Sequence, residues 1–307
     1  MKKMLKFLYG AMRGLLKRLS FRLVWYGLLS KDRKIIKMAG IENCETRVCF
    51  FPSVLHYFHG VPSLLRRKRY DYLIAQNFLR DEFLSCQKAK VFFTLEPPPY
   101  MTPETIRNMQ SERVKPFLYL YNEPDIKKRM FYPCLADRKE GIIKDLERRL
   151  PEKRSKLCCI VNRYSEHAGL NLLQQRMLFV KAMGNDIDIY GAEPWGKPNK
   201  WTVFPNYYGM ANNKQQTLRA YNFVIAFENT DHPGYITEKI VDAFKAGTVP
   251  LYWGGGAFVK ETIPSNCYID CRNRDPEEMY QLIKNMTQED IVSFRKASLE
   301  FLKIRCS

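Results

Sequence analysis

Several features that define other protein classes are missing from this sequence. It has no run of about twenty apolar residues, the length that crosses a bilayer as a helix, so no membrane span is expected. It has no internal repeats and no low-complexity tracts, and its first residues lack a clean signal-peptide core with a small-residue cleavage site. With 307 residues, 46% of them hydrophobic, the chain is expected to form two globular domains with sizeable cores.

Cysteine is sparse and follows no recognisable pattern. Nine cysteines are too few for a disulfide scaffold in a chain of this length, and the number is odd. No pair of CxxC motifs is present, so a structural zinc site is not expected. A reduced, cytosolic setting fits this usage best. Cys267 and Cys271 are near enough in sequence to pair, but unpaired thiols are the favoured interpretation.

Acidic residues are almost absent from the first forty positions. Asp32 stands there against eleven Lys and Arg, so more than half of the net charge of +18 lies in this segment. Over residues 1–28, leucines and one methionine share an arc of about 100° on a helical wheel, with basic residues opposite. This pattern favours a basic amphipathic helix on an anionic membrane, which would make the protein peripheral on the cytoplasmic face. A terminal helix packed on the core, with a solvated basic face, is the alternative.

The rest of the chain alternates strand and helix patterns, which predicts Rossmann-like α/β domains. After the basic segment 1–40, a first domain is expected over residues 41–150 and a second over residues 151–307. Strands are predicted in the first domain at 48–51, 70–75, 90–95 and 117–121. In the second domain, the patterns predict strands at 157–161, 187–190 and 267–270, and helices at 172–183, 276–285 and 289–302.

The most informative stretch is 223–256, which has the pattern of a strand, a loop, a helix and a second strand. Thr237 is suited to cap the start of the helix, and Gly247 stands where its C-cap is expected. This is one parallel βαβ crossover. In such sheets, ligands bind at the carboxyl ends of the strands, where the loop between strand and helix lies.

The residues of that loop suit a sugar nucleotide. A helix N-terminus favours a phosphate, and Lys239 in the first turn adds a full positive charge. The neighbouring Glu238 would accept hydrogen bonds from sugar hydroxyls, while Tyr235 and Asn229 supply neutral polar groups. A capped helix with solvated charges explains each residue taken singly about as well, but the combination favours the binding site.

Two patterns that suggest a metal site are discounted. Asp186 and Asp188 enclose an isoleucine in the DxD spacing of metal-dependent glycosyltransferases, but such alternation is common in strands. His56 and His59 are separated by two residues in the sequence His-Tyr-Phe-His, and no third metal ligand is apparent. Structural or surface roles are favoured for all four residues.

The segment AFENT…GYITEKIVDAF.AGTVPLYWGG closely resembles the signature of the bacterial-type α1,3/4-fucosyltransferases, glycosyltransferase family 10. The resemblance is strong over residues 155–270, weaker over 45–135 and absent from the first forty residues. It implies a GT-B fold, in which two Rossmann-like domains face a cleft and a terminal helix returns to the first domain. The first domain would bind the acceptor and the second the nucleotide sugar.

The resemblance also implies roles for individual residues. Glu96, which follows a predicted strand in the context Thr-Leu-Glu-Pro, would be the general base, with Glu104 and Glu123 as fallbacks. Arg176 and Lys239 would bind the diphosphate, so no metal is required and a divalent cation would at most stimulate the reaction. The other donor-binding residues implied for this chain are Tyr235 at the phosphates, Glu238 at the ribose or transferred sugar, and Asn162, Glu228 and Asn229 around them.

The activity implied is inverting transfer of L-fucose from GDP-fucose to a glycan hydroxyl. The family implies an α1,3-type linkage to the GlcNAc of an N-acetyllactosamine-like glycan, as in lipopolysaccharide that mimics host antigens. A related transferase that uses another GDP-sugar is the main alternative. A nucleic-acid-binding protein is a weaker one, because the basic excess lies mostly in a leucine-faced segment rather than among aromatics of the globular part.

Overall fold

The computed structural model describes the following residues of the chain: 48–51, 72–76, 89–93, 101, 103–109, 117–118, 140–163, 172–191 and 200–306. The predicted amphipathic helix over residues 1–28 lies outside them and stays a prediction. Within these ranges, no helix has the length and hydropathy of a membrane span. The described elements belong to two compact α/β units, and each unit is considered by itself.

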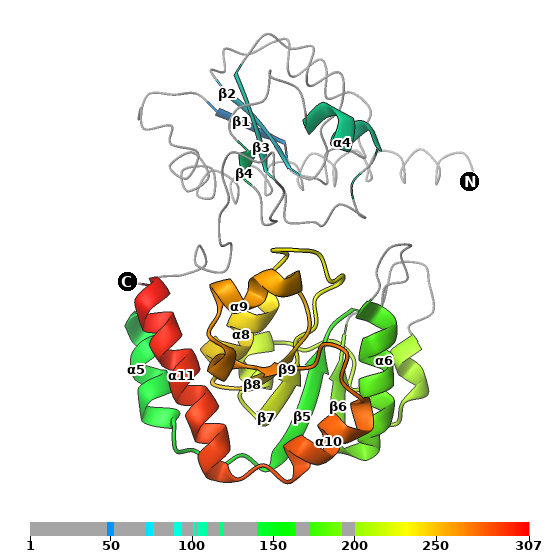
Figure 1. Cartoon of the computed structure of the whole chain (residues 1–307), viewed down its shortest axis with the longest axis vertical. Helices are drawn as coiled ribbons and strands as arrows, with labels where there is room; N and C mark the ends of the chain where they lie inside the picture. Colours follow the sequence, from blue (N-terminus) through cyan, green and yellow to red (C-terminus); the bar gives the residue numbers. More distant parts are fainter. Residues whose placement is uncertain are drawn as a thin grey trace, which may run out of the picture. The chain divides into compact units, whose positions relative to one another are not determined.

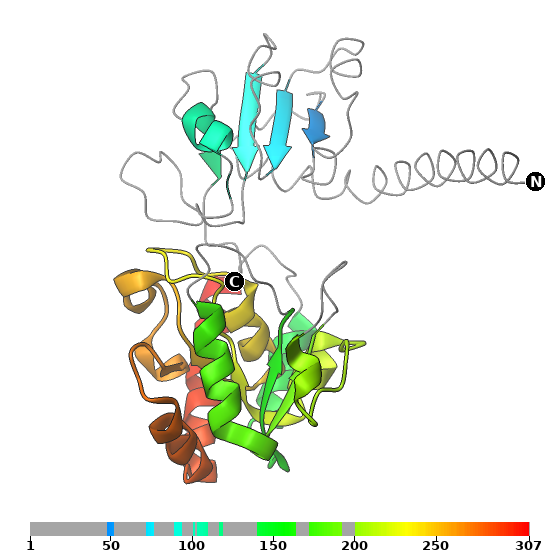
Figure 2. The ribbon, with the colours of Figure 1, turned by 90° about the vertical axis from the view of Figure 1, so that its right-hand side faces the viewer.

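The first unit contains a parallel sheet with the strand order β1-β2-β3-β4. Its elements are β1 (Val48–Phe51), β2 (Tyr72–Gln76), β3 (Ala89–Phe93), α4 (Pro103–Met109) and β4 (Phe117–Leu118). Figure 2 shows β1 in blue and β2 and β3 in cyan, side by side and pointing the same way. The four strands lie where the sequence predicts them, although β4 is shorter than the predicted strand.

The second unit is built on a five-stranded sheet, again entirely parallel, with the order β6-β5-β7-β8-β9 (Figure 1). Its strands are β5 (Lys156–Val161), β6 (Ile187–Tyr190), β7 (Tyr221–Ile225), β8 (Val249–Tyr252) and β9 (Ile269–Asp270). Its helices are α5 (Glu140–Arg149), α6 (Leu172–Met183), α7 (Lys214–Leu218), α8 (Glu238–Ala246), α9 (Val259–Thr262), α10 (Pro276–Lys284) and α11 (Gln288–Cys306).

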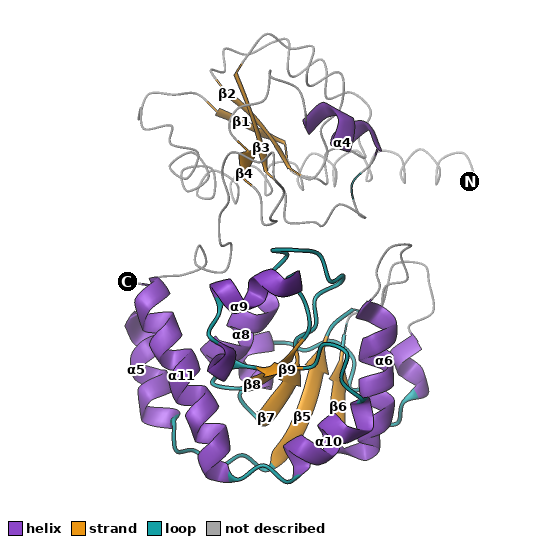
Figure 3. Cartoon of the chain, in the orientation of Figure 1, coloured by secondary structure: helices purple, strands orange, loops and turns teal. Residues whose placement is uncertain are grey.

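Helices cover both faces of this second sheet (Figure 3). Helices α6 and α10 pack together against one face, where Phe179 and Ile283 belong to the same buried core as Phe223. Helices α5, α8 and α11 pack on the other face, where Phe244 meets Phe301 edge to face. Because both faces are covered, a central strand such as β8 is buried at all four positions.

The βαβ crossover forms as predicted. Thr237 is the N-cap of α8, and Gly247 ends the helix in the left-handed conformation, with φ 63°. The predicted last strand is present but shorter than expected, because only Ile269–Asp270 pairs with β8. The residues before it form a 3₁₀ turn in which the Cys267 amide donates to the Pro264 carbonyl, so this backbone does not pair as strand.

Among the described residues, Cys267 and Cys271 are free thiols, as expected. Both side chains are fully buried. Burial raises the pKa of Cys267 to about 11, so the protonated form is favoured at neutral pH. Cys158 and Cys159 on β5 are also buried and unpaired.

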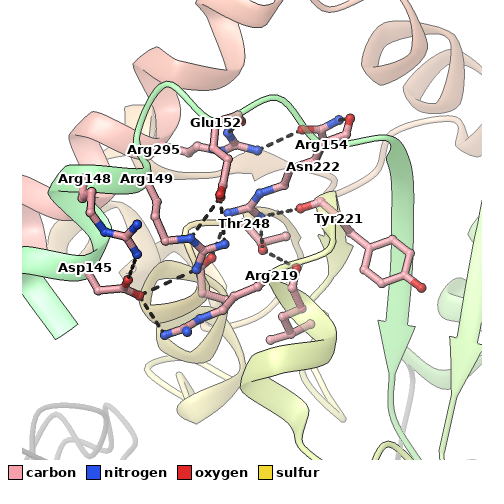
Figure 4. A network of polar contacts seen from close by, with 12 residues as sticks. Asp145, Arg148, Arg149, Glu152, Arg154, Arg219, Tyr221, Asn222, Thr248 and Arg295 are labelled. Carbon is pink, nitrogen blue, oxygen red and sulfur yellow. Dashed lines mark hydrogen bonds and ion pairs between the residues drawn. The ribbon is translucent and has the colours of Figure 1, made fainter. Parts of the chain in front are cut away.

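A half-buried arginine, Arg154, secures the end of α8 that lies away from the crossover loop (Figure 4). Arg154 donates to the Ala246 carbonyl in the last turn of α8 at 3.0 Å. It also donates to the Tyr221 carbonyl at 2.6 Å and to Thr248 Oγ1 at 2.8 Å. Burial lowers the pKa of Arg154 to about 9, so the side chain stays charged at neutral pH. One guanidinium therefore ties the C-terminus of α8 to the starts of β7 and β8.

Replacing Arg154 with methionine is expected to lower the free energy of unfolding by about 3 kcal/mol, because two buried carbonyls and a hydroxyl lose their donor. Arg148 provides the matched control. Its side chain is 75% exposed and pairs with Asp145, so Arg148→Met is expected to change stability by less than about 0.5 kcal/mol. Urea denaturation measures both variants, and equal losses would contradict the assignment.

Candidate functional site

The strand order of the second unit identifies where a ligand would bind. From β5 the chain crosses to β6 on one side and then returns to β7 on the other, so the direction of winding reverses between β5 and β7. Ligands of open parallel sheets bind at the carboxyl ends of the strands on either side of such a reversal. Asn162 directly follows β5, and Asn229 lies a few residues beyond β7. Both predicted site residues therefore lie at the reversal.

Arg176 joins these two strand ends. It projects from α6 and is only 3% exposed. Its Nη1 donates to Asn162 Oδ1 at 3.1 Å, and its Nη2 donates to Asn229 Oδ1 at 3.1 Å and to the Phe227 carbonyl. Together these three bonds fix the position of the guanidinium. Three residues predicted from separate segments are thus brought together around one buried cation.

The backbone at Asn162 is itself closely constrained. Its amide donates to the Tyr190 carbonyl at 2.9 Å, and its carbonyl accepts from Trp201 Nε1 at 3.0 Å. A Cβ atom on Gly191 would lie 2.2 Å from the same carbonyl oxygen, so only glycine permits this approach. Asn162 therefore presents its amide side chain from a fixed position.

The N-terminus of α8 adds charged groups to the site. Lys239 lies in the first turn with 15% of its side chain exposed, and the neighbouring Glu238 is exposed. Surrounding protein removes water from Glu238 and so acts to raise its pKa, but Lys239 and Lys214 outweigh this and the pKa is lowered. Glu238 therefore remains ionised at neutral pH.

Glu228 and Tyr235 lie deeper than the sequence alone indicates. Glu228 is fully buried, and its Oε1 accepts from the Thr237 amide at 2.7 Å and the Tyr252 hydroxyl at 3.1 Å. Its Oε2 accepts from Thr237 Oγ1 at 2.7 Å and from Lys239 Nζ at 3.0 Å. Tyr235 is 2% exposed. In this structure, then, the Glu228 carboxylate contacts protein groups on both oxygens.

Asp231 in the crossover loop and Arg272 beyond β9 together hold the backbone that follows β8. Neither residue was singled out from the sequence. Asp231 accepts from the Gly256 amide at 2.8 Å and from Trp253 Nε1 at 3.1 Å, and it pairs with Arg272 at 3.2 Å. Arg272 also donates to the Gly254 and Gly256 carbonyls. Its position two residues beyond the carboxyl end of β9 is the signal that could have found it, since the same criterion selected Glu96.

Glu96 and Glu123 lie outside the described residues, as do His56 and His59. Glu104 lies in the first turn of α4, in the other unit.

The two aspartates of the DxD pattern have protein partners. Asp188 accepts from Lys156 at 2.6 Å and from the Tyr221 hydroxyl at 2.5 Å. Asp186 accepts from the Tyr280 hydroxyl at 2.6 Å and from Lys284 at 3.1 Å. In the part of the chain that the structure describes, no three His, Cys, Asp or Glu side chains converge as metal ligands. That catalysis requires no metal stays a prediction.

Comparison with known sequences finds a family match within the second unit. Residues 150–295 match the sequence model of the glycosyltransferase family 10 (fucosyltransferase) C-terminal domain. The α-(1,3)-fucosyltransferase FucT of Helicobacter pylori is 44% identical over 54 residues, which are 18% of this chain and 11% of that protein. The human 4-galactosyl-N-acetylglucosaminide 3-α-L-fucosyltransferase 9 is 27% identical over 144 residues, 46% of this chain and 36% of that protein. The matches thus span well under half of either relative.

Solved structures extend the similarity to both units. An α1,3-fucosyltransferase crystallised with GDP-fucose aligns over 89% of this chain and 95% of its own, with a TM-score of 0.52 and 16% identity. The Anabaena protein HepE, solved with UDP and glucose, aligns over 83% of this chain and 80% of its own, with a TM-score of 0.56 and 12% identity. These similarities confirm the predicted GT-B fold.

Proposed function

We propose that this protein is a GDP-fucose-dependent α1,3-fucosyltransferase, because its residues 150–295 match the sequence model of the glycosyltransferase family 10 C-terminal domain. The observation that carries the proposal is the buried Arg176 held between the carboxyl ends of β5 and β7. A fixed cation at the reversal of a parallel sheet suits a nucleotide diphosphate. The family and its relatives supply the identity of the sugar and the base.

The chemistry requires a developing negative charge on the leaving GDP to be stabilised. In this proposal Arg176, Lys239 and the N-terminus of α8 would stabilise that charge, because each presents positive charge before the reaction begins. The ionised Glu238 would accept hydrogen bonds from the ribose or from fucose. In this proposal the fixed cations bind the diphosphate without an obligatory metal.

The proposed reaction is a single displacement with inversion. The acceptor hydroxyl oxygen attacks the anomeric carbon of fucose while the bond from that carbon to the β-phosphate oxygen breaks. Glu96 takes the hydroxyl proton, and GDP leaves with the bonding electron pair. The proposed acceptor is the GlcNAc of an N-acetyllactosamine-like glycan, such as one carried on lipopolysaccharide.

A donor screen tests the proposal. At saturating concentration, GDP and GDP-fucose are expected to raise the melting temperature by several degrees, whereas UDP-glucose is not. GDP-fucose should also be hydrolysed slowly to fucose and GDP, and an array of glycans should then identify the acceptor. Preference for another GDP-sugar would reassign the donor. Absence of any GDP effect, with a shift of nucleic acid in a mobility assay, would overturn the proposal in favour of nucleic-acid binding.

A further inference from the structure

We infer that Glu228 is a positioning residue that fixes the ammonium group of Lys239, and that it does not itself contact the donor. This inference rests on the proposed function, because it concerns how the protein holds a diphosphate. Glu228 was expected among the donor-binding residues. Its surroundings give it a different task.

The Glu228 side chain is fully buried. A carboxylate without solvent exposure is costly unless hydrogen bonds and a counter-charge compensate it. Glu228 has four donors at 2.7 to 3.1 Å, from Thr237, Lys239 and Tyr252. Both oxygens are engaged, so contact with a ligand would require breaking bonds that keep the carboxylate stable inside the protein.

The Glu228 side chain is also sterically confined. A Cβ atom on Gly254 would lie 2.4 Å from Glu228 Cγ and 2.8 Å from its Cβ. The backbone after β8 is therefore pressed against the Glu228 side chain. The carboxylate has no room on that side to swing toward a ligand, and glycine is required at position 254 for the packing to exist.

Two hydrogen bonds hold the ammonium group of Lys239. An ammonium group has three protons. Two of them have acceptors, Glu228 Oε2 at 3.0 Å and Thr237 Oγ1 at 3.1 Å. In the part of the chain that the structure describes, the third has no acceptor, and the side chain is 15% exposed. Two fixed bonds leave one direction for the third proton, at the helix N-terminus where an anion is favoured.

Thr237 links these groups into one unit. As N-cap it sets the start of α8, its amide and hydroxyl both donate to Glu228, and its hydroxyl accepts from Lys239. Glu228 therefore fixes the helix start and the lysine together. Substituting glutamine keeps an acceptor for the Thr237 amide, but an NH₂ group facing Lys239 would repel the ammonium protons.

The test is a double-mutant cycle on GDP affinity, measured by isothermal titration calorimetry with the full chain. Lys239→Ala and Glu228→Gln are each expected to weaken GDP binding about tenfold, the loss typical of one charge-assisted hydrogen bond. If Glu228 acts through Lys239, then adding Glu228→Gln to Lys239→Ala has no further effect on affinity. A general structural role would weaken binding in both backgrounds.

A matched control removes a different carboxylate from the same helix. Asp242 on α8 pairs with Lys214 at 2.7 Å, so Asp242→Asn removes an ion pair without disturbing Lys239. Its GDP affinity is expected to stay within about twofold of the unmodified protein. If Glu228→Gln does not fold, Glu228→Asp takes its place, because the shorter side chain keeps the charge but withdraws it from Lys239.

The outcomes distinguish failure of the proposed diphosphate site from failure of the positioning role of Glu228. If Lys239→Ala leaves GDP affinity unchanged, the proposed diphosphate site is wrong. If Lys239→Ala weakens binding but Glu228→Gln leaves it unchanged or strengthens it, only the positioning role fails, and Glu228 then acts as a charge that merely opposes the diphosphate. Additive losses also overturn the positioning role.

Discussion

Replacing Arg176 with methionine is expected to reduce kcat/KM for GDP-fucose by about 10³-fold. The guanidinium is the only group seen to bond both Asn162 and Asn229 among the described residues. Methionine has similar length and keeps the packing of α6, but it removes the charge and every donor. The diphosphate would lose its fixed cation, and the two asparagines would lose the group that holds them. Steady-state kinetics over a range of donor concentrations measures the effect.

Two further variants make this result interpretable. Lys181 lies on the exposed side of the same helix, so Lys181→Met removes a positive charge from α6 without touching the site, and activity should stay within about twofold. Arg176→Lys keeps the charge but lacks the planar fork that reaches two acceptors, so only partial activity is expected. If Arg176→Met matched the Lys181 variant, Arg176 would have no role at the donor.

Replacing Glu96 with glutamine is expected to lower kcat by about 10³-fold and to leave GDP affinity unchanged. Glutamine is nearly the same size, but it cannot accept the proton of the acceptor hydroxyl. The loss should therefore appear in the transfer step and not in donor binding. Transfer to a soluble acceptor and calorimetric titration with GDP together separate these two quantities.

The other candidate bases serve as comparisons. Glu104→Gln and Glu123→Gln are expected to retain kcat within about threefold of the unmodified protein, as substitutions away from the reacting atoms usually do. If one of them lost transfer while Glu96→Gln kept it, the base would be reassigned to that residue. Loss of GDP binding in Glu96→Gln would instead indicate that Glu96 supports the donor site.

The sequence predicted the parts of the fold that local signals determine. Helix 172–183 was predicted with the bounds that α6 has, and the caps Thr237 and Gly247 are where their residue types indicated. Strand 187–190 also matches β6. These signals depend only on residues a few positions apart, so they can be read from the sequence without knowledge of the tertiary structure. Strand β9 is shorter than predicted, because the apolar pattern does not distinguish the 3₁₀ turn before it from strand.

The arrangement of the site depended on contacts that no local signal contains. Arg176 meets Asn162 across 14 positions and Asn229 across 53. Only the strand order brings β5 and β7 side by side and makes these contacts possible. The resemblance implied which residues would lie near the donor, but it gave them as a set of positions rather than as a geometry.

Glu228 shows the same limit at a single residue. Its place after a buried strand predicted a residue at the sheet edge, and it is one. Whether such a carboxylate turns outward or inward depends on the backbone beyond the strand and on Tyr252, which the sequence analysis did not single out. Asp231 and Arg272 were missed for a related reason, since their pairing spans 41 positions of the chain.

The parallel sheet of the second unit also constrains how this part of the chain folds. Parallel neighbours cannot be joined by a tight turn, so no hairpin is available to nucleate the sheet. The central strand β5 finds its partner β7 only after some sixty intervening residues have been synthesised, as the pairing of Lys156 with Tyr221 shows. Closing a loop of that length costs conformational entropy before the two strands make any stabilising contact, and this slows folding. We therefore expect folding intermediates of this unit to expose β5, an apolar strand that chaperones would need to shield.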